Sequence, residues 1–135
     1  MTSNLDLQGK RVLVVGGETA LGRAVVIGLA EAGADVAIVS LSPDTNAEFA
    51  INSALNELWA LQRKGLALAI DATDAEQVRD AVARADRELG RLDLVIAVGE
   101  GAAVGALGER RVVELAVNAD ADEVLHDIRE QLKGG

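Results

Sequence analysis

Short apolar runs alternate with longer stretches of helical periodicity along the chain. Runs rich in Val, Ile, Leu and Ala predict four short strands, at residues 11–15, 35–39, 66–70 and 92–98. Between and after them, apolar residues recur at the three- and four-residue spacing of one helix face. This spacing predicts helices over residues 22–32, 43–63, 73–90 and 109–133, with a flexible loop at 99–108.

Residues at the predicted helix ends support these boundaries. Gly33 is placed to cap the end of the first helix. Ser42 precedes Pro43, which is the order expected of a cap residue and a first helical proline. Thr73 and Glu76 have capping-box spacing, in which the hydroxyl and the carboxylate accept from each other's free amides.

The predicted strands are apolar throughout rather than alternating, so we expect both faces of the sheet to be covered. Strands that alternate with helices indicate a parallel sheet with right-handed crossovers. The chain shows no internal repeat and no linker. The pattern therefore predicts one α/β domain.

Composition narrows the classes of function. The 135 residues carry a formal net charge of −9, which argues against nucleic acid or an anionic membrane as partner. The absence of cysteine excludes disulfides, thiolate metal sites and thiol nucleophiles from this sequence. No apolar stretch approaches the roughly 18 residues of a membrane span, and no leader is evident. We expect a cytoplasmic protein.

The turn after the first strand carries a family resemblance. Residues 15–22, VGGETALG, resemble the Thr-Gly-x-x-x-Gly-x-Gly loop of the short-chain dehydrogenase/reductase family. Gly16 and Gly22 match, whereas Val15 replaces the Thr and Ala20 the middle Gly. Four further segments resemble the family in the right order: LQGKRVLVVGG, IDATDAEQV, LGRLDLVI and VELAVNADADEVLHDIREQLKGG.

The resemblance implies a Rossmann-like three-layer αβα fold. Its four-stranded parallel sheet would have the order 3-2-1-4, with two helices on each face. Residues 1–135 would form a single truncated Rossmann-type dinucleotide-binding domain that holds NADP or NAD and no metal. The implied cofactor-binding residues are Gly16, Glu18, Thr19, Leu21, Gly22, Ser40, Asp71, Ala72, Ala97 and Gly99.

Two positions decide whether the loop still admits a pyrophosphate. A helix start offers free N–H groups and a positive dipole end to such a group. The Ala20 methyl narrows the room, and the Glu18 carboxylate opposes an anion unless it turns outward. The alternative is a tight turn kept only for packing. Ser40 stands where family members that prefer NAD carry an acid, which favours NADP slightly, although no Arg lies nearby.

Catalysis is expected to be absent from this chain alone. The family's general acid/base is a Tyr, and the sequence contains none. Asn118 matches the Asn of the family's proton relay, and Ala97 to Glu100 replace its Asn-Asn-Ala-Gly. We expect a catalytically silent NAD(P)-binding domain of oxidoreductase ancestry. The alternatives are a structural subunit without cofactor, and part of an active oxidoreductase completed by another chain.

Other conspicuous residues have ordinary explanations. Asp120, Glu123, Asp127 and Glu130 follow helical spacing and are expected to be a solvated face rather than a metal site. Phe49 and Trp59 are expected in the core or an interface. Strand 92–98 would be an open apolar edge, and helix 109–133 carries surplus apolar residues. We therefore expect a homodimer or a partner chain bound through these two elements.

Overall fold

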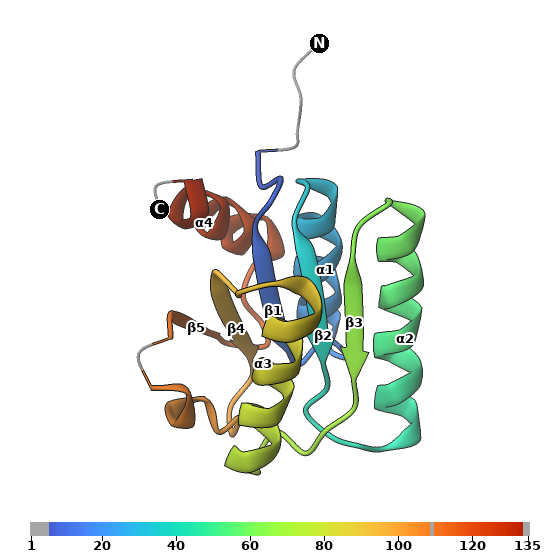
Figure 1. Cartoon of the computed structure of the whole chain (residues 1–135), viewed down its shortest axis with the longest axis vertical. Coiled ribbons are helices and arrows are strands. Elements are labelled where there is room, and N and C mark those ends of the chain that lie inside the picture. The colour runs from blue at the N-terminus through green and yellow to red at the C-terminus, as the bar shows by residue number, and fades with distance from the viewer. Residues whose placement is uncertain (1–5, 109, 134–135) are drawn as a thin grey trace.

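The computed structural model describes residues 6–108 and 110–133. Five parallel strands form one sheet in the order β3-β2-β1-β4-β5, with helices on both faces (Figure 1). The strands are β1 (Arg11–Val15), β2 (Asp35–Val39), β3 (Gly65–Leu68), β4 (Leu94–Val98) and β5 (Val112–Leu115). The helices are α1 (Ala20–Glu31), α2 (Thr45–Ala60), α3 (Ala75–Leu89), α4 (Ala121–Lys133) and the 3-10 turn η1 (Val104–Leu107). The α/β Rossmann-like fold is thus confirmed.

The fifth strand corrects the prediction for the last quarter of the chain. The predicted helix 109–133 begins at Glu109, which lies outside the described residues, and its next part is β5. This strand pairs with β4 in parallel, from Val95 opposite Val112 to Val98 opposite Leu115. Strand 92–98 is therefore not an open edge, and the prediction of a partner bound there is wrong.

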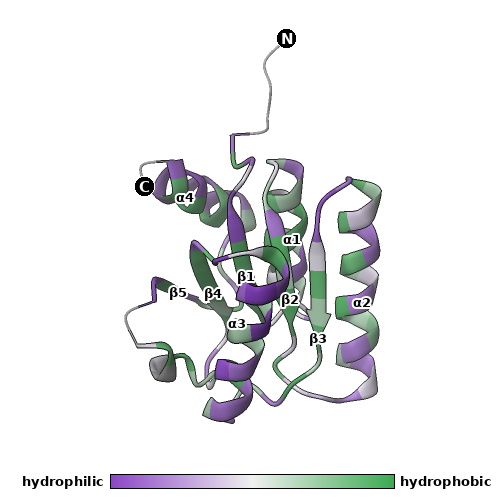
Figure 2. Cartoon of the chain, in the orientation of Figure 1, coloured by the Kyte–Doolittle hydropathy of each residue, from purple (hydrophilic) through white to green (hydrophobic). Residues whose placement is uncertain are grey.

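The helices divide three to one between the faces of the sheet. Side chains of α1, α2 and α4 share one buried cluster, and those of α3 and η1 share the other. Figure 2 shows apolar β1, β2 and β4 between these layers. The prediction of two helices on each face is wrong, because α4 follows β5 and returns beside α1. Its apolar residues Val124, Ile128 and Leu132 are buried there, so they offer no surplus apolar surface, and a partner chain at another face of this segment stays a prediction.

Aspartates, not the predicted hydroxyls, cap two of the helices. The Asp74 carboxylate accepts from the N–H groups of Glu76 (2.9 Å) and Gln77 (3.3 Å), so the Thr73 capping box is wrong. Asp44 caps α2, and the Ser42 hydroxyl donates to its carboxylate (3.0 Å). In both cases the capping carboxylate lies one or two residues nearer the helix than the predicted hydroxyl.

Candidate functional site

Glycines at the β1–α1 turn bring the start of α1 directly onto the end of β1. Gly16 has a φ of +95°, and a Cβ on it would lie 2.8 Å from the Val98 carbonyl oxygen. A Cβ on Gly22 would lie 2.0 Å from the Gly16 carbonyl oxygen. Both positions therefore require glycine. The two glycines that match the family loop are explained by contacts within this chain, whether or not a ligand binds.

Thr19 closes the turn and begins α1. Its hydroxyl accepts from the Gly22 N–H (2.9 Å) and donates to the Gly16 carbonyl (2.7 Å). Within the described part of the chain, the N–H groups of Ala20 and Leu21 have no hydrogen-bond partner. Free amides at a positive dipole end are groups that can bind an anion. A Thr just before a periodic apolar run was the sequence signal for this start, two residues earlier than predicted.

The two residues expected to obstruct this turn, Ala20 and Glu18, are accommodated in different ways. Ala20 is exposed as the first residue of α1, so the turn keeps its shape without the family's middle glycine. Glu18 turns sideways to the end of β2. Its carboxylate accepts from the Leu41 N–H (2.8 and 3.0 Å to the two oxygens) and from the Ser42 N–H (3.3 Å). Sequence reasoning missed this contact, which spans more than twenty residues.

The ends of β2 and β3 are joined by buried polar contacts. The Ser40 side chain is fully buried, and its hydroxyl accepts from the Ile70 N–H (2.9 Å) and donates to the Ile70 carbonyl (3.3 Å). Asp71 accepts from the hydroxyl (2.6 Å) and the N–H (3.0 Å) of Thr73, and these bonds lower the pKa of the Asp71 carboxyl. Both side chains therefore have structural partners of their own.

The remaining predicted positions have buried side chains or, at Gly99, no side chain. The side chains of Leu21, Ala72 and Ala97 are buried. Gly99 has a φ of +89° and donates its N–H to the Leu115 carbonyl (2.8 Å). Because carboxyl ends of parallel strands meet at one edge of a sheet, the ten predicted residues lie along this edge, in or after the strands and at the start of α1.

Asn118 does not lie on a helix. It is an exposed residue of the turn between β5 and α4, whereas the resemblance placed its segment within the long helix. The acidic residues Asp120, Glu123, Asp127 and Glu130 are exposed, and the described residues contain no group of three potential metal ligands. None of the described helices combines the length and the apolar character needed to cross a membrane.

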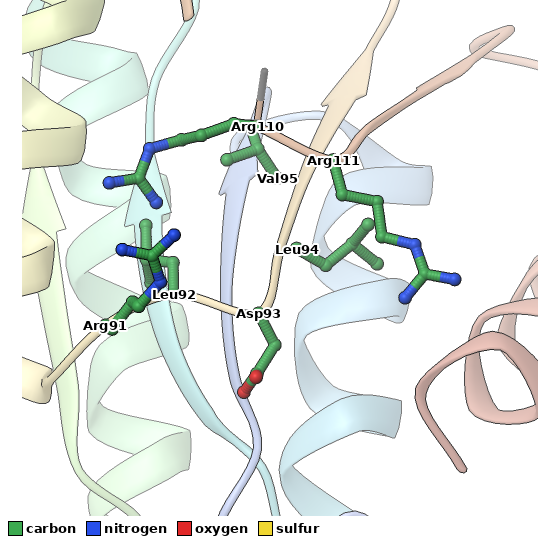
Figure 3. Close-up of a pocket in the computed structure, with 7 residues that line it drawn as sticks. All are labelled: Arg91, Leu92, Asp93, Leu94, Val95, Arg110 and Arg111. Carbon is green, nitrogen blue, oxygen red and sulfur yellow. The ribbon is translucent and has the colours of Figure 1, made fainter. Parts of the chain in front are cut away.

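A separate pocket lies at the opposite edge of the sheet. Its volume is about 260 Å³, and its lining comes from the segment that enters β4 and from Arg110 and Arg111 before β5 (Figure 3). Arg110 forms an ion pair with Asp86, and the Asp93 carboxylate accepts from the Arg11 N–H (2.9 Å). This pocket is at the amino ends of the strands, away from the glycine turn.

Comparisons with known proteins identify the ancestry of this fold. A sequence model described as "short chain dehydrogenase" matches residues 10–126. A cyclohexanol dehydrogenase of Rhodococcus sp. (strain TK6) is 35% identical over 118 residues, 82% of this chain and 43% of that protein. An L-rhamnose 1-dehydrogenase (NAD(P)(+)) of Sphingomonas sp. (strain SKA58) is 39% identical over 90 residues, 67% of this chain and 34% of that protein.

Solved structures with a similar fold support the same ancestry. A metagenomic blue fluorescent protein in complex with NADPH is 34% identical with a TM-score of 0.63, over 67% of this chain and 36% of that one. A hydroxysteroid dehydrogenase from Escherichia coli is 25% identical with a TM-score of 0.64, over 75% and 41%. The chain spans less than half the length of these relatives. It belongs to the short-chain dehydrogenase/reductase family of NAD(P)-binding oxidoreductases.

Proposed function

We propose that this chain binds NAD or NADP at the β1–α1 turn and does not turn over a substrate by itself. The observation that carries the proposal is the backbone of that turn. Gly16 and Gly22 are held by close backbone contacts, and the amides of Ala20 and Leu21 are free in the described part of the chain. A dinucleotide pyrophosphate is the anion that such a turn accepts in an α/β sheet.

In the proposed complex, each segment at this edge of the sheet contacts a different part of the dinucleotide. The free amides at the start of α1 would hold the pyrophosphate, and the segment after β2 would hold the adenosine ribose. Asp71 would lie beside the adenine, and the backbone at Ala97 and Gly99 beside the nicotinamide. The bound cofactor would supply a hydride or accept one.

Turnover needs side chains that this sequence does not contain. The family's proton donor is a Tyr, the sequence has none, and Asn118 lies exposed in a turn. A partner chain with the catalytic half would supply the missing donor. We therefore propose a binding domain of oxidoreductase ancestry, and a structural subunit without cofactor is the outcome that the following test would reveal instead.

Thermal unfolding with NAD(H) or NADP(H) tests this proposal. A ligand at about 1 mM with a Kd of about 10 µM stabilises the folded state by about 2.7 kcal/mol, which raises Tm by several degrees. The diagnostic variant is Ala20→Pro. Proline is tolerated at the first helical position, and Thr19 before it already has an extended ψ of 158°.

Ala20→Pro removes one of the proposed phosphate-binding amides without removing a hydrogen bond of the described chain. We expect it to keep the wild-type Tm and to lose most of the ligand-induced rise. Thr45→Pro is the matched control, because it makes the same change at the first residue of α2, after Asp44 with a ψ of 164°. No rise in wild type with either cofactor would favour the structural subunit. An undiminished rise in Ala20→Pro would place the pyrophosphate elsewhere.

A further inference from the structure

The Glu18 carboxylate occupies the end of β2, where a dinucleotide fold places the adenosine ribose. We propose that Glu18 is the ribose-binding acid of this chain and that it selects NAD(H) over NADP(H). This inference rests on the proposed binding of a dinucleotide. It assigns a specificity-determining role to a loop residue that faces the site from the β1 side.

The residue at the usual position for such an acid cannot contact a ligand in this protein. Ser40 directly follows β2, but its side chain is fully buried and its hydroxyl is bound to both backbone groups of Ile70. It therefore cannot reach a ligand without breaking those bonds. Glu18 brings a carboxylate to the same place from the preceding turn, and the Leu41 and Ser42 amides hold it there.

The hydrogen bonds of this carboxylate suit a diol and not a phosphate. An ionised carboxylate accepts at about four positions, and the Leu41 and Ser42 amides make three contacts with it, which leaves a position for a ribose hydroxyl. A 2′-phosphate would need donors at this point. The Leu41 and Ser42 amides are already bound to Glu18. The phosphate would therefore have to displace a like charge to reach them.

Neighbouring charged groups also disfavour a 2′-phosphate at this place. The Ser42 hydroxyl is bound to the Asp44 carboxylate (3.0 Å), and Asp71 follows β3 at the same edge. Arg23, in the first turn of α1, is directed to Ser53 (3.3 Å) and Glu57 (3.7 Å) of α2. Among the described residues, no ion pair involves Glu18. The site therefore repels a 2′-phosphate and lacks the Arg that would accommodate one. The proposal is therefore opposite to the slight preference for NADP that the sequence suggested.

Dissociation constants for NADH and NADPH, measured by isothermal titration calorimetry on the full chain, test the assignment. A hydrogen bond to a charged group changes affinity by about tenfold to a hundredfold. We expect wild type to bind NADH at least about tenfold more tightly than NADPH. Glu18→Gln keeps an oxygen for the amides and removes the charge, so NADH should weaken and NADPH should tighten. Glu31→Gln makes the same charge change at the exposed far end of α1 and should leave both constants unchanged.

The outcomes separate this inference from the proposed function. Equal affinities in wild type, or tighter NADPH, would overturn the role of Glu18 and leave dinucleotide binding standing, and this result needs no variant to fold. An unchanged ratio in folded Glu18→Gln would do the same. Binding by Glu18→Gln alone would make Glu18 a block rather than a ligand, which also overturns the inference. No binding by wild type or by Glu18→Gln would overturn both.

Discussion

Replacing Gly22 by alanine tests the turn on which the proposed site depends. A Cβ there would lie 2.0 Å from the Gly16 carbonyl oxygen and 2.8 Å from the Thr19 hydroxyl. Neither atom is free to move, because the carbonyl accepts from Thr19 and the hydroxyl caps α1. Overpacking costs about 1–3 kcal/mol and loss of a cap about 1 kcal/mol, against a gain of at most about 1 kcal/mol in helix propensity. We expect a net loss of about 2 kcal/mol.

Gly28→Ala is the matched control, because it makes the same change in the same helix. A Cβ on Gly28 would lie 2.4 Å from Leu125 Cδ1 of α4. That atom is the end of a flexible, half-buried side chain, which can move at a cost of about 0.5–1.5 kcal/mol. The helix-propensity gain of about 1 kcal/mol offsets this cost, so the stability of Gly28→Ala should stay close to that of wild type.

Urea unfolding followed by circular dichroism measures both variants without any ligand. With an unchanged m-value, Gly22→Ala should lose about 2 kcal/mol and its Tm should fall by roughly 6–10 °C. A Gly22→Ala variant as stable as Gly28→Ala would refute the reasoning. The start of α1 would then not lie against the Gly16 carbonyl, and the steric argument for the turn would fail with it.

Three further predictions test other parts of the fold. Asp74→Ala should cost about 1 kcal/mol in urea unfolding because it removes the cap of α3, whereas Thr73→Ala should cost clearly less; the reverse order would restore the Thr73 capping box. Ile128→Ala should cost about 2–5 kcal/mol, since this α4 side chain is 1% exposed, and a cost below about 1 kcal/mol would contradict the packing of α4 on α1. The Ala47 N–H, and then the Ser42 hydroxyl, hold the pKa of Asp44 below its usual value. The resulting stabilisation is present above the unfolded pKa of about 4 and is lost as the pH falls through the lower folded pKa. Between about pH 6 and about pH 3, the free energy of unfolding of Asp44→Asn should therefore fall less than that of wild type.

The first three quarters of the fold could be predicted because each element there is long or strongly apolar. Strand β5 could not. It has only four residues, and Val113, Val117, Val124 and Ile128 happen to follow a spacing that continues into α4. Only pairing with β4 distinguishes a strand from the start of a helix in such a segment. The missing strand then placed α4 on the wrong face and left β4 at an edge.

Exposed aromatic residues show a second limit of periodicity. The sequence predicts Phe49 and Trp59 in the core or at an interface, yet their side chains are 72% and 57% exposed. Both lie on α2, whose inward residues already fill the space over β2 and β3. A core position for either residue is therefore wrong, and an interface stays a prediction.

The backbone turn of the candidate site could be predicted from the sequence, whereas the contacts of its side chains could not. Gly16 and Gly22 are constrained by atoms a few residues away, so a local motif reports them. The bonds from Leu41 and Ser42 to Glu18 cross from one βα unit to the next, and no local pattern encodes them. The sequence therefore located the glycine turn but assigned the proposed ribose end to Ser40, which the fold buries.

This division explains how binding can be separated from turnover in such a fold. A pyrophosphate is held mainly by amides and a helix dipole, which any residue other than proline supplies once the glycines permit the turn. Val15 and Ala20 can therefore replace the family's residues without removing a backbone amide. Proton transfer depends instead on one side chain with a suitable pKa within reach of the substrate. This sequence contains no Tyr and keeps the glycines of the turn, so affinity for the dinucleotide, measured without substrate, is the property by which the proposed function stands or falls.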